Sequence, residues 1–182
     1  MVQKLGITIF MAVISTLLTA QCLYQKIEFD AVAGQAATIV DGKVVSAECV
    51  WNADHSMIYT RYGIRVYTLY KGQADSMVYF YSPGGEIDLK AIKVEPSVHP
   101  QPGSYGLFMV DAAEERSKLP QGSLQLGFGH LSWYPYNYLT GIASGVFQDF
   151  DLSKKELERA IVSVTGLSPQ TKISLPIVKK QC

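Results

Sequence analysis

The sequence MIYTRYGIRVYTLY, residues 57–70, decides the fold that we expect for this chain. Its side chains alternate with a period of two, and most are β-branched or aromatic. One face carries Ile58, Thr60, Tyr62, Ile64, Val66 and Thr68, and the other carries Tyr59, Arg61, Gly63, Arg65 and Tyr67. This alternation predicts a half-buried antiparallel β-strand.

The segments on both sides of this strand also favour β-structure. Residues 38–51 predict one strand with a bulge at Gly42, although the Asp41-Gly42 pair would also suit a hairpin turn. The polar residues 52–56 predict a hairpin loop. Further strands are expected at residues 77–81, 89–94, 103–110 and 124–128.

One helix is expected near the C-terminus, at residues 153–165. Ser153 and Glu156 have the spacing of a capping box, and Gly166 is suited to end the helix. The apolar residues recur at helical spacing and predict one face that packs on the sheet: Leu157, Ala160, Ile161 and Val164. The sequence therefore predicts a mainly β fold: a small antiparallel sandwich or OB-like barrel of about five to seven strands, with one C-terminal α-helix packed on it.

Three other segments are expected to lack regular structure. Pro96, Pro100 and Pro102 predict an extended connection. Residues 133–138, WYPYNY, predict an aromatic-dense loop, and residues 167–182 predict a loose C-terminal tail.

The N-terminus has the pattern of a secretory signal peptide. Lys4 is followed by an apolar stretch to about Leu18 and then by small and polar residues, so cleavage is expected after Ala20. A retained anchor helix and a lipid attached at Cys22 are the alternatives. We therefore expect residues 1–20 to be a signal peptide and residues 21–166 to be an exported domain, secreted, periplasmic or at the cell surface.

The composition excludes several classes of protein. Lys and Arg total 16, Asp and Glu total 16, and 48% of the residues are hydrophobic. Balanced charge without a basic stripe argues against nucleic-acid binding. No apolar run after the signal peptide approaches 18 residues, so no transmembrane segment is expected in the mature chain.

Cys22, Cys49 and Cys182 are the three cysteines. Export would allow one bridge and leave one thiol over. A Cys22–Cys182 bridge is favoured because chain termini often lie close together; a chain without any bridge is the equal alternative. No metal-binding spacing is present, so no metal or cofactor is expected.

No catalytic motif is present among the polar residues. His55, His99 and His130 lie outside any HExxH pattern, and the chain has no GxSxG and no P-loop. His55 beside Asp54 could suggest acid–base work or a metal ligand, but a solvated turn explains both residues. We therefore expect no enzymatic activity.

Two groups of residues are candidates for a contact surface. Tyrosine and tryptophan supply large, rigid contact area at protein interfaces and on sugar faces, and Trp133, Tyr134, Tyr136 and Tyr138 are clustered in the chain. Arg61 and Arg65 share the outer face of the central strand. Ordinary packing and an ordinary solvated sheet face would explain the same residues.

Several short motifs occur in order between residues 40 and 85: VxGxVxS from Val40, WNADH from Trp51, IYT from Ile58, VY at residues 66–67, KG at residues 71–72 and PGG from Pro83. Together with the strand at 103–110 and the helix around Leu157, this pattern resembles a β-rich N-terminal domain of bacterial secreted multidomain proteins. Such domains often precede a matrixin-like peptidase or a type IX secretion sorting domain. The pattern is also similar, more weakly, to the netrin/tissue-inhibitor type of OB-like barrel.

The resemblance covers residues 37–166 and implies an accessory role without catalytic residues. No peptidase or sorting domain follows, so we expect either a stand-alone version or the N-terminal part of a longer protein. The expected function is binding of another secreted or surface protein. A metallopeptidase inhibitor or pro-domain-like module, a carbohydrate-binding surface and a hydrolase without a recognisable motif are the alternatives.

Overall fold

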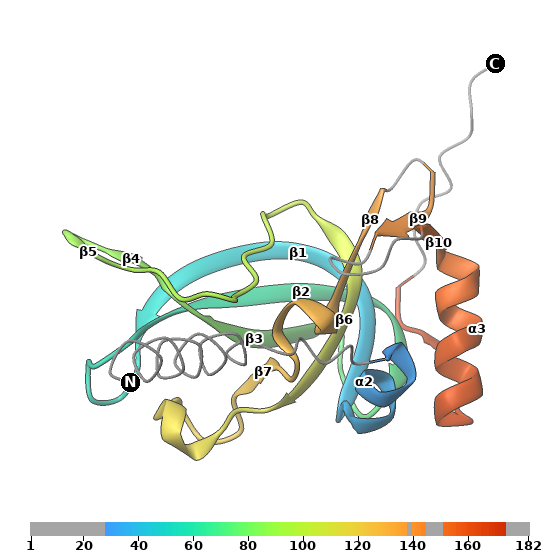
Figure 1. Cartoon of the computed structure of the whole chain (residues 1–182), viewed down its shortest axis with the longest axis horizontal. Helices are drawn as coiled ribbons and strands as arrows, with labels where there is room; N and C mark the ends of the chain where they lie inside the picture. Colours follow the sequence, from blue (N-terminus) through green and yellow to red (C-terminus); the bar gives the residue numbers. More distant parts are fainter. Residues whose placement is uncertain (1–27, 138–139, 145–150, 174–182) are drawn as a thin grey trace, which may run out of the picture.

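The computed structural model describes residues 28–137, 140–144 and 151–173 (Figure 1). The predicted signal peptide, Tyr138, Cys22 and Cys182 lie outside these residues. The described part contains eleven strands and two α-helices, and the second helix follows the main sheet near the C-terminus. The expected mainly β fold with a C-terminal helix is confirmed.

Two long strands form the central hairpin. β1 (Thr38–Trp51) and β2 (Ile58–Lys71) pair antiparallel along almost their whole lengths, as expected, and residues 52–57 turn the chain between them. The register shifts at Gly42 and again between Val44 and Ser46. A Cβ atom on Gly42 would lie 2.4 Å from the carbonyl oxygen of Arg65, so the close approach of the two strands requires glycine there.

Five strands pair in a ring. β1 pairs with β2 on one side and with β6 (Tyr105–Ala112) on the other, and β2 pairs with β3 (Met77–Pro83). β7 (Leu124–Leu126) pairs antiparallel with β6 and parallel with β3, through Tyr81 and Gln125. This circuit is that of a small barrel, one of the two architectures that the sequence predicts.

The sheet continues beyond the ring from the edge of β6 that also pairs with β7. β8 (Trp133–Asn137) pairs with β6, β9 (Ile142–Ser144) pairs with β8, and β10 (Asp151–Ser153) pairs with β9. The prediction of a loop at residues 133–138 is therefore wrong for 133–137. Pro135 is tolerated because β9 pairs only with Tyr136 and Asn137 and does not reach it.

The expected fourth strand is shorter than predicted and lies outside the main sheet. β4 (Gly85–Ile87) and β5 (Lys90–Ile92) form a separate two-stranded hairpin that projects from one end of the barrel (Figure 1). Its turn exposes the whole side chain of Leu89. The proline-containing connection from residue 93 to residue 104 has no helix or strand, as expected.

The C-terminal helix α3 (Lys154–Thr165) begins and ends as predicted. Ser153 Oγ accepts a hydrogen bond from the Glu156 N–H, and the Ser153 N–H donates to Glu156 Oε2 at 2.7 Å. Gly166 ends the helix at a φ of 67°. Leu157 and Ile161 are completely buried, so the predicted apolar face is the one that packs.

A second helix, α2 (Phe29–Gln35), was not expected. Seven residues are too few to show a helical period in the sequence, and no side chain caps the first turn. Its Phe29, Val32 and Ala33 are buried and pack with Leu157 and Ile161 of α3. Tertiary packing therefore stabilises this short helix.

The prediction of a loose tail is wrong for part of the segment that follows α3. β11 (Gln170–Thr171) pairs antiparallel with Leu69 and Thr68 of β2. Residues 174–182 lie outside the described part.

The apolar core has two parts. One lies among the ring strands and includes Val44, Ile64, Phe80 and Phe108. The other joins β6 and β8 to the two helices and includes Leu107, Tyr134 and Leu157. Side chains of β6 therefore pack into both parts of the core.

Candidate functional site

The outer face of β1, β2 and β3 carries Arg61, one of the predicted contact residues. Arg61 lies between Glu48 of β1 and Tyr81 of β3 in the sheet register. Its Nη2 donates to Glu48 Oε2 at 2.7 Å, and this hydrogen bond raises the pKa of the guanidinium. The guanidinium also lies 5.5 Å from the centre of the Tyr79 ring, in cation–π contact.

Tyr79 of β3 is the most exposed aromatic side chain on this face, at 48% exposure. It lies close to Gly63 of β2: a Cβ atom there would be 3.1 Å from Tyr79 Cε1 and 2.5 Å from Ser46 Oγ. The absence of a side chain at Gly63 therefore lets the ring lie against the sheet. Arg65, two residues further along β2, is exposed on the same face. We call Tyr79, Arg61, Gly63 and Arg65 the Tyr79 platform.

A groove of about 790 Å³ begins beside the platform. It lies between the end of β2, the start of β3 and the turn around Gly122. The residues that line it include Leu69, Asp75, Met77, Tyr79, Gln170 and Lys172. The groove is therefore bordered both by the platform and by the residues of β11.

The aromatic cluster of β8 does not form one surface. Tyr134 is 3% exposed and packs edge-on against Phe29, with ring centres 5.4 Å apart. Trp133 is half-buried and stacks on Phe108, with ring centres 6.3 Å apart. Strand alternation separates neighbouring aromatic residues, and β8 pairs with β6 and β9 rather than with β2 or β3. The structure thus places Arg61 and Arg65 on one face of β2 but does not join them to the aromatic residues of β8.

Tyr136 borders a small pocket beside an ion pair whose carboxylate is buried. Asp41 of β1 is 2% exposed, and its Oδ2 accepts a hydrogen bond from Lys154 Nζ at the start of α3. The ammonium group lies 5.7 Å from the centre of the Tyr136 ring. Burial raises the pKa of Asp41 although Lys154 opposes this, and burial raises the pKa of Tyr136 as well. The cavity beside them has a volume of only about 110 Å³.

A chain of hydrogen bonds attaches the segment after β5 to the barrel. Ser97 Oγ donates to the carbonyl oxygen of Val94 at 2.5 Å and lies 2.8 Å from His99 Nε2. His99 Nδ1 lies 3.1 Å from the hydroxyl of Tyr62. Because Ser97 gives its proton to Val94, His99 is assigned as the Nε2–H tautomer that accepts from Tyr62.

Burial perturbs both ring groups of this chain. It lowers the pKa of His99 and raises the pKa of Tyr62 to about 12. Ser97 also borders a cavity of about 390 Å³ at the same end of the barrel, where Tyr59, Tyr81 and Arg116 take part in the lining. The hydroxyl of Ser97 is directed to a backbone carbonyl rather than to His99, so the hydrogen bonds hold the segment in place.

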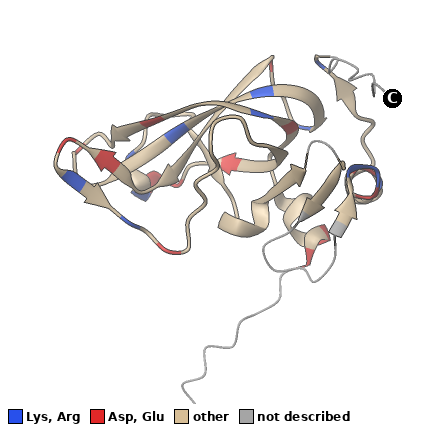
Figure 2. Cartoon of the chain, turned by 90° about the horizontal axis from the view of Figure 1, so that it is seen from above, with Lys and Arg blue, Asp and Glu red and all other residues tan. Residues whose placement is uncertain are grey.

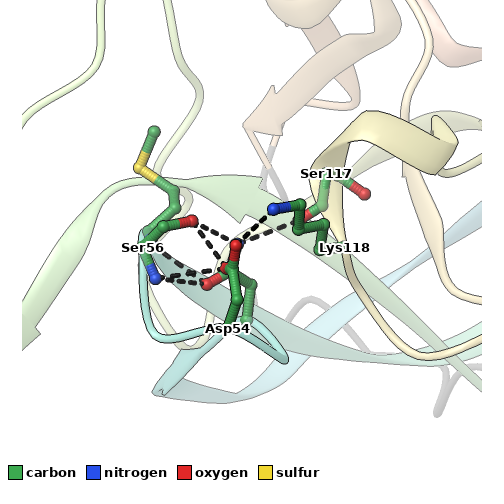
Figure 3. Close-up of polar contacts among 6 residues, drawn as sticks. Asp54, Ser56, Ser117 and Lys118 are labelled. Atoms are coloured by element: carbon green, nitrogen blue, oxygen red, sulfur yellow. Dashed lines mark hydrogen bonds and ion pairs between the residues drawn. The ribbon is translucent and has the colours of Figure 1, made fainter.

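Asp54, next to His55 in the β1–β2 turn, is also part of a structural contact (Figure 3). Its carboxylate accepts hydrogen bonds from Ser56 Oγ at 2.6 Å and from Lys118 Nζ. These contacts hold its pKa well below the ordinary value. The ring of His55 lies 5.9 Å from that of Trp51. This arrangement fits the solvated turn that the sequence suggested.

Within residues 28–137, 140–144 and 151–173, no three His, Cys, Asp or Glu side chains are grouped so that they could hold a metal ion. No helix of this part is long and apolar enough to cross a membrane. Cys49 is a half-buried free thiol, with its Sγ 3.7 Å from Thr60 Oγ1.

In comparisons with known proteins, no family model, no curated protein and no solved structure matches the chain. The candidate site is therefore defined by its own geometry. Tyr79 was missed in the sequence because residues 77–81 showed only the apolar content of a strand. Tyr79 belongs to the site because the strand register places it opposite Gly63, next to Arg61.

Proposed function

We propose that the chain is an exported, non-enzymatic β-domain that binds another secreted or surface protein through the Tyr79 platform. The observation that carries this proposal is the half-exposed Tyr79 ring, placed over Gly63 and flanked by the Arg61 guanidinium. The signal-peptide pattern of residues 1–20 supports export.

The platform has the chemistry of a protein-binding hot spot. Tyrosine and arginine are the residue types most enriched at such positions, together with tryptophan. Arg61 is already held by Glu48, so binding would immobilise few additional rotamers. Figure 2 shows basic and acidic residues interspersed along the strands, which supports a protein partner rather than nucleic acid.

Affinity capture with matched variants tests the proposal. Wild-type protein, Tyr79→Ala and Leu89→Ala would be immobilised and exposed to the secreted proteins of the same organism. Leu89 is the control because it is fully exposed on a different element, the β4–β5 hairpin. We expect a protein that wild type and Leu89→Ala retain and Tyr79→Ala loses. With the purified partner, Tyr79→Ala should raise Kd about tenfold or more.

Equal capture by folded Tyr79→Ala and wild type would contradict the proposal. Retention on insoluble polysaccharide that Tyr79→Ala abolishes would assign the platform to carbohydrate instead. Inhibition of a purified secreted peptidase, abolished by the same substitution, would identify the partner as an enzyme and favour the inhibitor alternative.

A further inference from the structure

Part of β2 has an edge that β3 leaves open. β3 pairs with β2 from Tyr59 to Arg65, and the chain then leaves the sheet through residues 72–76. β1 covers the other side of β2 as far as Lys71. The Val66 N–H still donates to the carbonyl oxygen of Ser76 at 2.9 Å, so the part of β2 that β3 leaves uncovered runs from residue 67 to residue 71, on the side away from β1. We call this part the β2 edge.

The chain fills the β2 edge with its own β11. Gln170 lies opposite Leu69 and Thr171 opposite Thr68. The N–H of Lys172 donates to the carbonyl oxygen of Tyr67 at 2.8 Å, and the N–H of Ile173 approaches the same oxygen at 3.3 Å. The contact shows that this edge accepts an antiparallel extended segment.

Within the part of the chain that the structure describes, few contacts hold β11 on β2. β11 has two residues, and both are exposed, so its side chains add little apolar burial to the backbone hydrogen bonds. Each such bond contributes little net free energy, because the separated groups would bond to water instead. A longer strand that also filled the adjoining 790 Å³ groove, which borders both β11 and Tyr79, would have more contacts than β11 has.

We propose that the β2 edge is a strand-addition site, at which an extended segment of the partner protein displaces β11 and lays its side chains in the groove beside Tyr79. This inference rests on the proposed function, protein binding at the Tyr79 platform. Main-chain hydrogen bonds would supply affinity, and the groove would select side chains. β11 acts as a resident competitor that the partner must replace.

A peptide-binding measurement on the full chain tests this site. The probe is a fluorescein-labelled peptide with the sequence of residues 167–173, LSPQTKI. Lys172→Pro removes the N–H that donates to Tyr67 and so releases β11, whereas the control Lys172→Ala keeps that N–H. We expect Lys172→Pro to bind the peptide at least about tenfold more tightly than wild type or Lys172→Ala, because the tethered competitor is lost. A peptide with proline at the position of Lys172 should not bind.

Equal, weak binding by Lys172→Pro and wild type would overturn the proposal, provided that both unfold cooperatively. If Lys172→Pro does not fold, hydrogen exchange in the wild-type protein tests whether β11 can be displaced. The amide of Lys172 should exchange much faster than the amides of β2, and equal protection would show that β11 is not displaceable. A wild-type dimer that Lys172→Pro converts to a monomer would assign the edge to a second copy of the chain and also overturn the proposal.

Competition separates this proposal from the proposed function. Capture that depends on Tyr79 but is unaffected by excess peptide would leave the platform standing and reject the strand-addition site. Peptide binding to Lys172→Pro, combined with capture that does not depend on Tyr79, would support the strand-addition site and reject the Tyr79 platform.

Discussion

Lys118 donates a hydrogen bond to the carboxylate of Asp54, 64 positions earlier in the chain. Asp54 belongs to the β1–β2 turn, and Lys118 follows the 3-10 helix η1 (Glu115–Ser117). The same two segments are joined by the Ala53 N–H, which donates to the Lys118 carbonyl oxygen at 3.0 Å. The contact fixes the turn against the connection between β6 and β7.

Asp54→Asn should lower the Tm at pH 7. The carboxylate has a depressed pKa when folded, so its contribution is present above the ordinary pKa of 3.8 and is lost as the pH falls towards the folded-state pKa. The difference in Tm between wild type and Asp54→Asn should therefore shrink below about pH 4. Thermal unfolding followed by circular dichroism from pH 3 to pH 7 measures this. A difference that stays constant across this range would contradict the assignment.

Lys154→Met should destabilise the fold because it leaves the buried carboxylate of Asp41 without its cation. We expect a loss of about 3 kcal/mol, at the lower end for buried pairs because Lys154 is one-third exposed. The raised pKa of Asp41 gives the opposite pH dependence to that of Asp54: this variant should recover stability as the pH is lowered. Urea unfolding should also show that Asp41→Asn combined with Lys154→Met is more stable than Lys154→Met alone.

Ser153→Ala should remove the cap of α3 and cost about 1 kcal/mol. Ser163→Ala, at an exposed position in the body of the same helix, is the control and should leave the free energy of unfolding almost unchanged. Urea unfolding compares the two variants. Equal effects of both substitutions would show that the capping box contributes nothing specific.

Gly42→Ala should destabilise the barrel, because the new methyl group would meet the Arg65 carbonyl oxygen and Ile64 Cγ2 within about 2.5 Å. Such overpacking costs about 1–3 kcal/mol. Gly34→Ala is the matched control: it lies in α2, and its nearest contact would be Val164 Cγ1 at 3.7 Å. That control should be neutral or stabilising by about 0.5–1 kcal/mol. Chemical denaturation of both variants measures the contrast.

His99→Gln should change how stability depends on pH. Burial lowers the pKa of His99, with His130 acting in the same direction and Glu95 against it. Wild type should therefore lose stability as the pH falls through 6.5, the ordinary pKa of histidine, whereas His99→Gln should lack this loss. Nuclear magnetic resonance titration of the His99 ring gives an independent check. A His99 pKa at or above 6.5 would contradict the prediction.

The strands and the capped helix could be predicted because each depends on local pattern. The alternation in residues 57–70 and the spacing of Ser153 and Glu156 predict a strand and a helix start without reference to the rest of the fold. α2, β8 and β11 could not be predicted in this way. α2 depends on Phe29 packing with the second core, β8 contains a proline tolerated by its place in the sheet, and β11 depends on an edge of β2 formed 100 residues earlier.

The candidate site was only partly visible in the sequence for the same reason. Arg61 and Arg65 followed from alternation along one strand. Tyr79 is part of the site because sheet pairing places it opposite Gly63. The register between two strands cannot be read from the sequence of either strand alone. The aromatic residues of 133–136 are close together in the sequence. A β-strand nevertheless places neighbouring side chains on opposite faces, so closeness in the sequence does not make them one surface.

The ring of five strands has a consequence for how the chain folds. Its seam between β3 and β7 is a single residue pair, Tyr81 with Gln125, whereas β1 and β6 pair across more than 60 residues of intervening chain. Closing so long a loop costs entropy before the contacts are made, so topologies of this kind fold slowly, on about the millisecond-to-second scale. We expect the β1–β2 hairpin, with its local turn, to form first and the seam between β3 and β7 to close last.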